Sequence, residues 1–216
     1  MNGKRWTTLA VASLIGPLAA QAQVVSDDAC PKYAVDVAAF ATCDDDRVAR
    51  SDSAAALPAA KQSHSARHLQ AADAYALLQK AARGVLVDVR SQPEVALSGR
   101  PAIAHLHVPY QQAVWSQHDA AWTMAPNHRF GEELMTQLAA RGIGPDDLVV
   151  LVSRAGVRSA RAADELSDFG YAQIVTIVDG FEGDLGPDQR RSVNGWKNAG
   201  LPWTDTTTAA LVSGRR

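Results

Sequence analysis

Short apolar segments alternate with segments of helical periodicity from about residue 68 onward, and this alternation constrains the fold most. Strand-like apolar runs cover, in chain order, residues 85–89, 106–109, 148–152 and 174–178. Apolar residues at helical spacing cover 71–83, a segment from Asn127 to Gly142, and 158–169. Strands that alternate with helices predict an α/β fold in which an open parallel sheet carries helices on both faces.

Residues that commonly cap or end helices set the expected bounds of these helices. Gly84 and Gly170 follow two of the helical segments, and glycine commonly ends a helix in the left-handed conformation. Asn127 is the expected N-terminal cap of the middle helix. The segment at 148–152 is wholly apolar, which predicts a strand that is buried on both faces.

The first residues have the pattern of a secretory signal peptide. Lys4 and Arg5 precede an apolar run over 9–20, and Ala20 and Ala22 are the small residues that a signal peptidase reads. We therefore expect residues 1–22 to be removed, which predicts a periplasmic or secreted protein with no membrane association after cleavage. An uncleaved anchor is the alternative, but the apolar run is shorter than the ~20 residues of a membrane span.

Two cysteines lie close together after this segment. An even pair in an oxidising compartment predicts a disulfide between Cys30 and Cys43, and the alternative is a redox-active or sulfur-carrying thiol. They belong to an expected N-terminal extension over 23–65 that ends in a linker. A domain over 66–204 follows, and residues 205–216 are expected to form a flexible terminus.

Composition excludes several classes of protein. Hydrophobic residues make up 47% of the 216 residues and charged residues 20%, which is typical of a globular chain. The formal net charge is −2, so no nucleic-acid partner is expected. Only the apolar run at 9–20 approaches the length of a membrane span, which excludes a polytopic membrane protein.

The most informative segment follows the apolar run at 148–152. It reads Ser153-Arg154-Ala155-Gly156-Val157-Arg158-Ser159 and leads into a helix. Gly156 permits a tight turn, and the N–H groups of such a turn, with the helix dipole, form an anion nest to which Arg154 and Arg158 add whole charges. This spacing predicts a small oxyanion above Ser153. An ordinary strand-to-helix turn with surface arginines fits the spacing equally well.

The same residues resemble the catalytic loop of the rhodanese-like family, Cys-Arg-x-Gly-x-Arg-Ser. Arg154, Gly156, Arg158 and Ser159 match it, and Ala155 and Val157 take the variable positions. Further blocks resemble the family in order: residues 86–90, with Asp88 and Arg90 as supporting residues, then Glu94, 105–110, 160–171 and 178–181. The resemblance covers about 66–204 and implies the rhodanese-like fold.

The departure from the family falls on the chemistry. Active rhodaneses move a sulfane sulfur from a donor such as thiosulfate and carry it as a cysteine persulfide, and the position of that cysteine is Ser153 here. A hydroxyl is far less acidic than a thiol, whose pKa is about 8.5. We therefore expect persulfide formation to be absent or strongly impaired.

Three functions stay open on this sequence, and so does the question whether the chain is an enzyme. The first is a module that binds thiosulfate, sulfite or sulfate, or a protein partner, without turnover. The second is a sulfurtransferase that uses another thiol, and the third is a docking factor of a periplasmic redox enzyme. No cofactor or metal is expected, because His105 and His107 share a face without a clear third and fourth ligand.

Overall fold

The computed structural model describes residues 57–205. The expected signal peptide, the pair Cys30 and Cys43, and the terminal segment 206–216 lie outside the described residues. The elements, in chain order, are η3 (Ala59–Lys61), β1 (Arg67–Leu69), α2 (Ala71–Lys80), β2 (Gly84–Asp88), α3 (Gln92–Ser98), β3 (Arg100–Pro101), β4 (Leu106–His107), β5 (Gln111–Ser116), β6 (Ala121–Pro126), α4 (Phe130–Ala140), β7 (Leu148–Val152), α5 (Val157–Asp168), β8 (Ile174–Ile177) and β9 (Trp203–Thr204).

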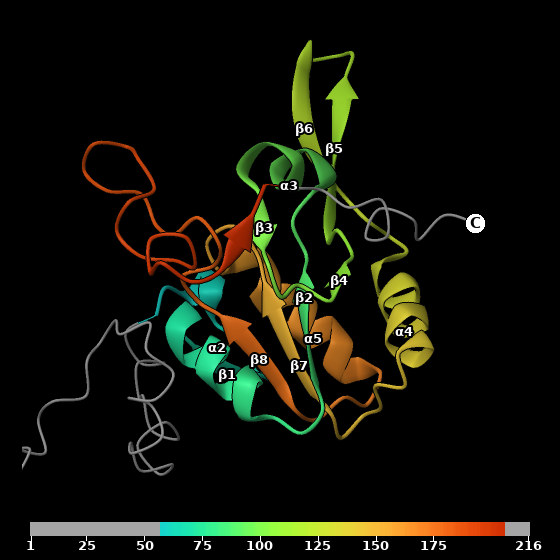
Figure 1. Cartoon of the computed structure of the whole chain (residues 1–216). Coiled ribbons are helices and arrows are strands. Elements are labelled where there is room, and N and C mark those ends of the chain that lie inside the picture. Colours follow the sequence, from blue (N-terminus) through green and yellow to red (C-terminus); the bar gives the residue numbers. More distant parts are fainter. Residues whose placement is uncertain (1–56, 206–216) are drawn as a thin grey trace, which may run out of the picture. The chain divides into compact units, whose positions relative to one another are not determined.

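Five strands form one parallel sheet in the order β1-β8-β7-β2-β4. The central strands β7 and β2 pair over five positions, from Gly84 opposite Leu148 to Asp88 opposite Val152. Their carboxyl ends point toward the end of the sheet that also carries α3 (Figure 1). The predicted α/β fold with an open parallel sheet is confirmed.

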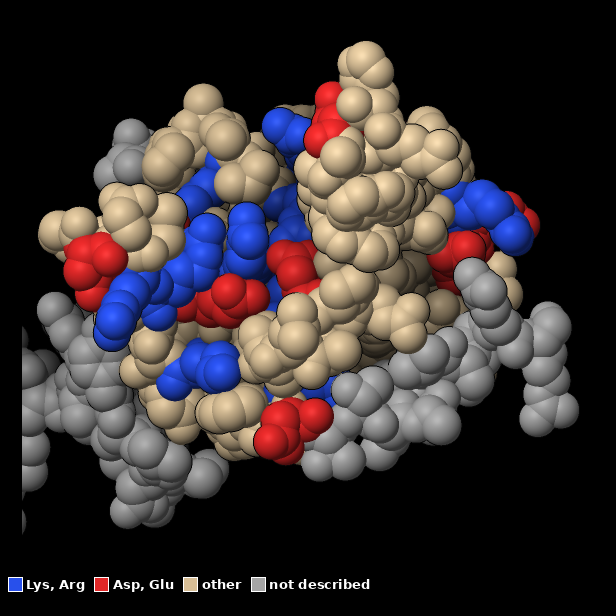
Figure 2. Space-filling view, turned by 90° about the horizontal axis from the view of Figure 1, so that it is seen from above, with Lys and Arg blue, Asp and Glu red and all other residues tan. Residues whose placement is uncertain are grey.

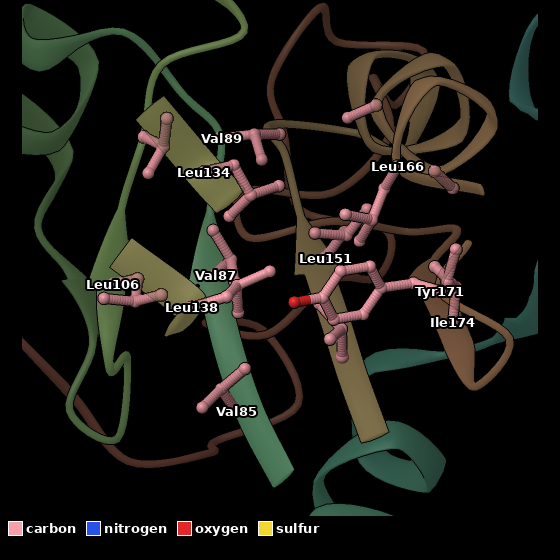
Figure 3. Close-up of a cluster of buried hydrophobic side chains, with 14 of the residues drawn as sticks. Val85, Val87, Val89, Leu106, Leu134, Leu138, Leu151, Leu166, Tyr171 and Ile174 are labelled. Carbon is pink, nitrogen blue, oxygen red and sulfur yellow. The ribbon is translucent and has the colours of Figure 1, made fainter. Parts of the chain in front are cut away.

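Alternating side chains of the strands build two cores, one on each face of the sheet. In β7, Val149 and Leu151 pack with residues of α4 and α5, whereas Val150 and Val152 pack with residues of α2. The labelled side chains of Figure 3 show the first core, in which Leu134 and Leu138 of α4 meet the strands. A strand that faces a core on both sides must be apolar throughout, as the segment 148–152 is. Helices therefore cover both faces, as expected.

Two helix boundaries differ from expectation. The helix predicted over 71–83 ends at Lys80, and Gly84 begins β2 rather than ending the helix. A Cβ on Gly84 would lie 3.0 Å from the Leu78 side chain, so the glycine serves close packing of α2 on the sheet. The cap of α4 is Arg129, not Asn127, whose side chain instead accepts the Arg129 N–H and donates to the Pro109 carbonyl.

Residues 111–126, for which the sequence predicts no element, form the antiparallel hairpin β5–β6. The hairpin projects beyond α3 at the end of the sheet where the strands finish (Figure 1). Trp115 and Trp122 face each other across it as a T-shaped pair, with ring centroids 5.7 Å apart, and both are exposed. Within residues 57–205, no helix combines the length and the apolar character that crossing a membrane requires.

Candidate functional site

The segment that the sequence singled out forms the turn between β7 and α5. Its backbone is fixed by the neighbouring turn after β8: the Phe181 N–H donates to the Ser153 carbonyl at 2.8 Å, and the Glu182 N–H donates to the Arg154 carbonyl at 3.0 Å. Both turns lie at the carboxyl ends of parallel strands, where α/β sheets bind ligands.

Two glycines allow these turns to touch through their backbones. Gly156 has φ +92°, and a Cβ there would lie 2.2 Å from the Val178 carbonyl oxygen. Gly180 has φ +67°, and its Cβ would lie 2.5 Å from the Arg154 carbonyl oxygen. Any larger residue at either position would separate the turns. The start of α5 is thus held rigidly over the edge of the sheet.

Ser153 is buried at the base of the turn, with 1% of its surface exposed. Its Oγ accepts the Gly156 N–H at 3.1 Å and lies 3.2 Å from the Ser159 Oγ. The Ser159 hydroxyl donates to the Gly156 carbonyl at 2.9 Å. Because a hydroxyl has one proton, Ser159 accepts from Ser153. The Ser153 hydroxyl is therefore engaged within the turn, so its proton is not directed at the oxyanion that the sequence predicts above Ser153.

Backbone N–H groups around the turn remain available to a ligand. Among residues 57–205, no acceptor takes a hydrogen bond from the N–H of Ala155, Val157 or Arg158. These groups precede or begin α5, where helix N–H groups have no intrahelical partner and the helix dipole is positive. The turn therefore presents several donors and a partial positive charge, which is the requirement for binding a small anion.

The two arginines of the turn are not equivalent. Both terminal nitrogens of Arg158 donate to Glu94 at 2.6 Å, and this pair is largely buried. The Arg154 side chain is about half exposed (49%), and its Nε lies 3.8 Å from the Glu94 Oε1. The sequence led us to expect two whole charges for an anion, but Glu94 neutralises one of them.

Glu94 is the site residue whose role the sequence analysis missed. It occupies the third position of α3 and forms a capping box with Ser91. Burial alone would raise the pKa of the Glu94 carboxyl, but hydrogen bonds from Arg158 and Ser91 hold that pKa at about 2. The spacing Ser-x-x-Glu was a readable signal for the cap. No local pattern indicated a contact with Arg158, because 64 residues separate the two.

The expected supporting residues, Asp88 and Arg90, form a buried ion pair beneath the site. The Arg90 Nη2 donates to the Asp88 carboxylate at 2.6 Å and to the Gly99 carbonyl at 2.7 Å. The guanidinium also lies 4.1 Å from the centroid of the Phe181 ring. Arg90 therefore ties the end of β2 to α3 and to the turn after β8, and it supports the site from below.

The face above the turn carries a mixture of charges. Figure 2 views the end of the sheet where the strands finish, and it shows Lys and Arg side chains gathered around a few acidic ones beside a largely uncharged projection. Near the turn, the Arg191 Nε lies 4.0 Å from the carboxylate of Glu182, whose own N–H donates to the Arg154 carbonyl. Lys197 lies 3.8 Å from the centroid of the Trp203 ring.

The histidines weighed as metal ligands are engaged with the backbone. The His105 Nδ1 accepts the Leu86 N–H at 3.0 Å, and the His107 Nε2 lies 2.8 Å from the Arg90 carbonyl oxygen. In the part of the chain that the structure describes, no three His, Cys, Asp or Glu residues form a group that could hold a metal.

Comparisons with known proteins identify related chains. A sequence model of the rhodanese-like domain matches residues 70–183. An uncharacterised protein of Rickettsia prowazekii is 28% identical over 130 residues, which cover 60% of this chain and 90% of that protein. The crystal structure of Rv0390 from M. tuberculosis superposes with a TM-score of 0.51 at 28% identity, over 65% of this chain and 98% of that one. The polysulfide-sulfur transferase homodimer of Wolinella succinogenes gives a TM-score of 0.43 at 26% identity, over 70% and 85% of the two chains.

The contact between the two turns predicts unequal effects of alanine at two glycines. Gly156→Ala adds backbone strain and a clash with Val178, so we expect it to lower the free energy of unfolding by about 3 kcal/mol or more. Gly170 also has a positive φ, +87°, but nothing lies within 4 Å of its Cβ position. Gly170→Ala should therefore cost only about 1 kcal/mol. Equal losses in denaturant titrations would contradict the proposed role of the close contact.

The buried carboxylate of Asp179, next to Gly180 in the turn after β8, should make the stability of the protein depend on pH. Its carboxylate accepts the N–H groups of Ala71 and Gly195 at 2.8 and 2.9 Å, and burial raises its pKa from 3.8 to about 6. A raised pKa means that the folded state binds the proton more tightly. The contribution of Asp179 to stability is therefore greatest below pH 3.8 and declines as the pH rises through 6, by about 3 kcal/mol in all.

Asp179→Asn isolates this effect, because asparagine does not titrate. We expect the variant to gain about 3 kcal/mol relative to the wild type between about pH 4 and pH 8, on top of a constant loss from the altered hydrogen bonds. The measurement is urea unfolding of both proteins across that range. A difference that stays constant with pH would show that Asp179 titrates normally in the folded protein.

Proposed function

The chain belongs to the rhodanese-like domain family, and from this premise we propose that it binds a small sulfur oxyanion without forming a persulfide. One observation carries the proposal. The turn over 153–159 has free N–H groups and a half-exposed cation, while Ser153, to which we assign the position of the family's nucleophile, is buried and has an engaged hydroxyl.

The absence of turnover follows from the chemistry of oxygen. A persulfide forms when a thiolate attacks a sulfane sulfur, and the serine hydroxyl is not ionised at neutral pH. Ionising Ser153 would also break its hydrogen bond to Ser159. The chain has two cysteines, Cys30 and Cys43, and both precede the described residues. A sulfurtransferase reaction by this chain would need one of them.

The ligand class follows from the donors. N–H groups at the start of α5 bind the oxygens of a compact anion, and the half-exposed Arg154 can reach one that lies above the turn. Thiosulfate, sulfite and sulfate are compact anions of this kind. Thiosulfate is a sulfur donor of the family, and sulfite and sulfate are similar to it in shape and charge. The Asp88–Arg90 pair keeps the floor of the site rigid but has no donor directed at such a ligand.

We further propose that the chain is exported to the periplasm or secreted, and that Cys30 pairs with Cys43. The basic residues before the apolar run at 9–20 support export, and an oxidising compartment would favour the disulfide. Intact mass of the protein recovered from the producing cell should correspond to residues 23–216 with two hydrogens missing. A full-length chain or two free thiols would contradict these proposals.

The hairpin β5–β6 favours a second candidate function, that of a module that docks a protein. Between residues 111 and 126 only Asp119 carries a formal charge, and Val114, Trp115, Trp122 and Met124 are exposed. Exposed aromatic residues on a projecting element are typical of protein contacts. Anion binding and docking are compatible, because they use different residues.

Restoring the thiol tests the proposal. Ser153→Cys should acquire thiosulfate:cyanide sulfurtransferase activity, because the helix dipole and the loop N–H groups stabilise a thiolate. The wild type should release no thiocyanate above background. The matched control is the double exchange Cys30→Ser with Cys43→Ser in both backgrounds. A wild-type rate that this double exchange abolishes would contradict the proposal and favour a sulfurtransferase that uses another thiol.

Calorimetry tests the anion site itself. The wild type should bind thiosulfate, and Arg154→Ala should weaken that binding about tenfold, which corresponds to about 1.4 kcal/mol. Arg129→Ala is the control, because it removes the same charge from an exposed arginine of the α4 cap that is paired with Glu132. Absence of heat with thiosulfate, sulfite and sulfate would leave docking as the function.

A further inference from the structure

The carboxylate of Glu94 lies near both arginines of the turn. Its Oε1 lies 2.6 Å from Arg158 and 3.8 Å from Arg154, so one carboxylate faces both cations that an oxyanion would use. Its Oε2 accepts a second bond from Arg158, at 2.6 Å, and the hydroxyl of Ser91, at 2.7 Å. The carboxylate is therefore anchored and cannot swing away when a ligand arrives.

The charges around the turn add to a single positive unit. Arg154 and Arg158 are positive and Glu94 is negative, and the start of α5 contributes about half a charge more. The pKa of Glu94, about 2, keeps it ionised throughout the neutral range. A singly charged oxyanion is fully balanced by these charges, whereas a doubly charged one exceeds them.

We infer that Glu94 is a specificity-determining residue that sets the charge class of the bound oxyanion, favouring monoanions over dianions. This rests on the proposed anion-binding function and names the ligand class of the same site. Glu94 acts as a fixed internal anion. It repels a dianion twice as strongly as a monoanion, because the Coulomb energy is linear in the charge of the ligand. Hydrogensulfite, a monoanion, fits this site better than sulfate or thiosulfate.

Glu94→Gln tests the inference with two probes of one shape. Sulfate and perchlorate are both tetrahedral oxyanions, with charges of two and one. Glutamine preserves the capping box with Ser91 and one acceptor for Arg158. We expect the variant to bind perchlorate about threefold more tightly and sulfate about tenfold, since the factor for the dianion is the square of the factor for the monoanion. The measurement is calorimetry at constant ionic strength.

Glu182→Gln is the matched control. It removes one negative charge from the same face, but Glu182 lies near Arg90 and Arg191, at 3.8 and 4.0 Å, and makes no ion pair with the arginines of the turn. Its effect on either probe should stay below about twofold. Glu94→Asp keeps the charge but shortens the side chain, so it should retain the wild-type ratio of perchlorate to sulfate affinity.

The outcomes separate the inference from the proposed function. If the wild type binds both probes and Glu94→Gln changes their affinities by the same factor or by none, the inference fails and anion binding stands. If neither protein binds either probe and the wild type also gives no heat with thiosulfate and sulfite, the proposed function fails and the inference with it. Arg154→Gln, which leaves α3 untouched, gives an independent check. The fold-loss of sulfate affinity in this variant should equal the square of its fold-loss of perchlorate affinity.

Discussion

The contact between two backbone turns, made possible by Gly156 and Gly180, is the constraint on which the rest of the site depends. It brings the turn after β7 against the turn after β8 and fixes the direction in which α5 begins. The parallel sheet supplies the platform, since β7 and β8 are adjacent and end at the same edge. An anion site made of backbone groups needs this rigidity, because its donors are useful only while they converge.

The charged residues refine this backbone site in two layers. Beneath it, Arg90 and Asp88 join β2 to α3 in a buried ion pair. Such a pair adds little net stability, but removing one of its two partners strongly destabilises the protein. Above it, Glu94 divides the two arginines of the turn into one that is neutralised and one that is half exposed. The electrostatic character of the site therefore depends on a carboxylate from another element as much as on the turn.

The fold could be predicted from the sequence because hydrophobic periodicity reports directly on burial. The sequence predicts the strand 148–152 with the bounds that the structure has, because four of its five residues are buried and Leu148 packs against a core. Gly84 was misassigned because a glycine after a helical segment resembles a helix end, whereas here it serves packing across elements. The hairpin over 111–126 escaped notice because its exposed tryptophans obey no core periodicity.

The site could be predicted only where its residues are neighbours in the sequence. The turn over 153–159 is contiguous, so its glycine and arginines can be read together. Its neutralisation by Glu94 and the engaged hydroxyl of Ser153 depend on contacts through space, and no local pattern reports them. Asp88 and Arg90 were identified by family resemblance, and the structure gives them a physical role as the brace beneath the turn.

The central claim is that the start of α5 offers its N–H groups to an anion while Ser153 stays committed to its own turn. Amide chemical shifts of the isotopically labelled protein during a titration with thiosulfate test this most directly. The account predicts saturable shifts concentrated at Ala155, Val157 and Arg158, and full reversal when the anion is dialysed away. Shifts that avoid these amides, or an added sulfur atom that survives dialysis, would contradict it.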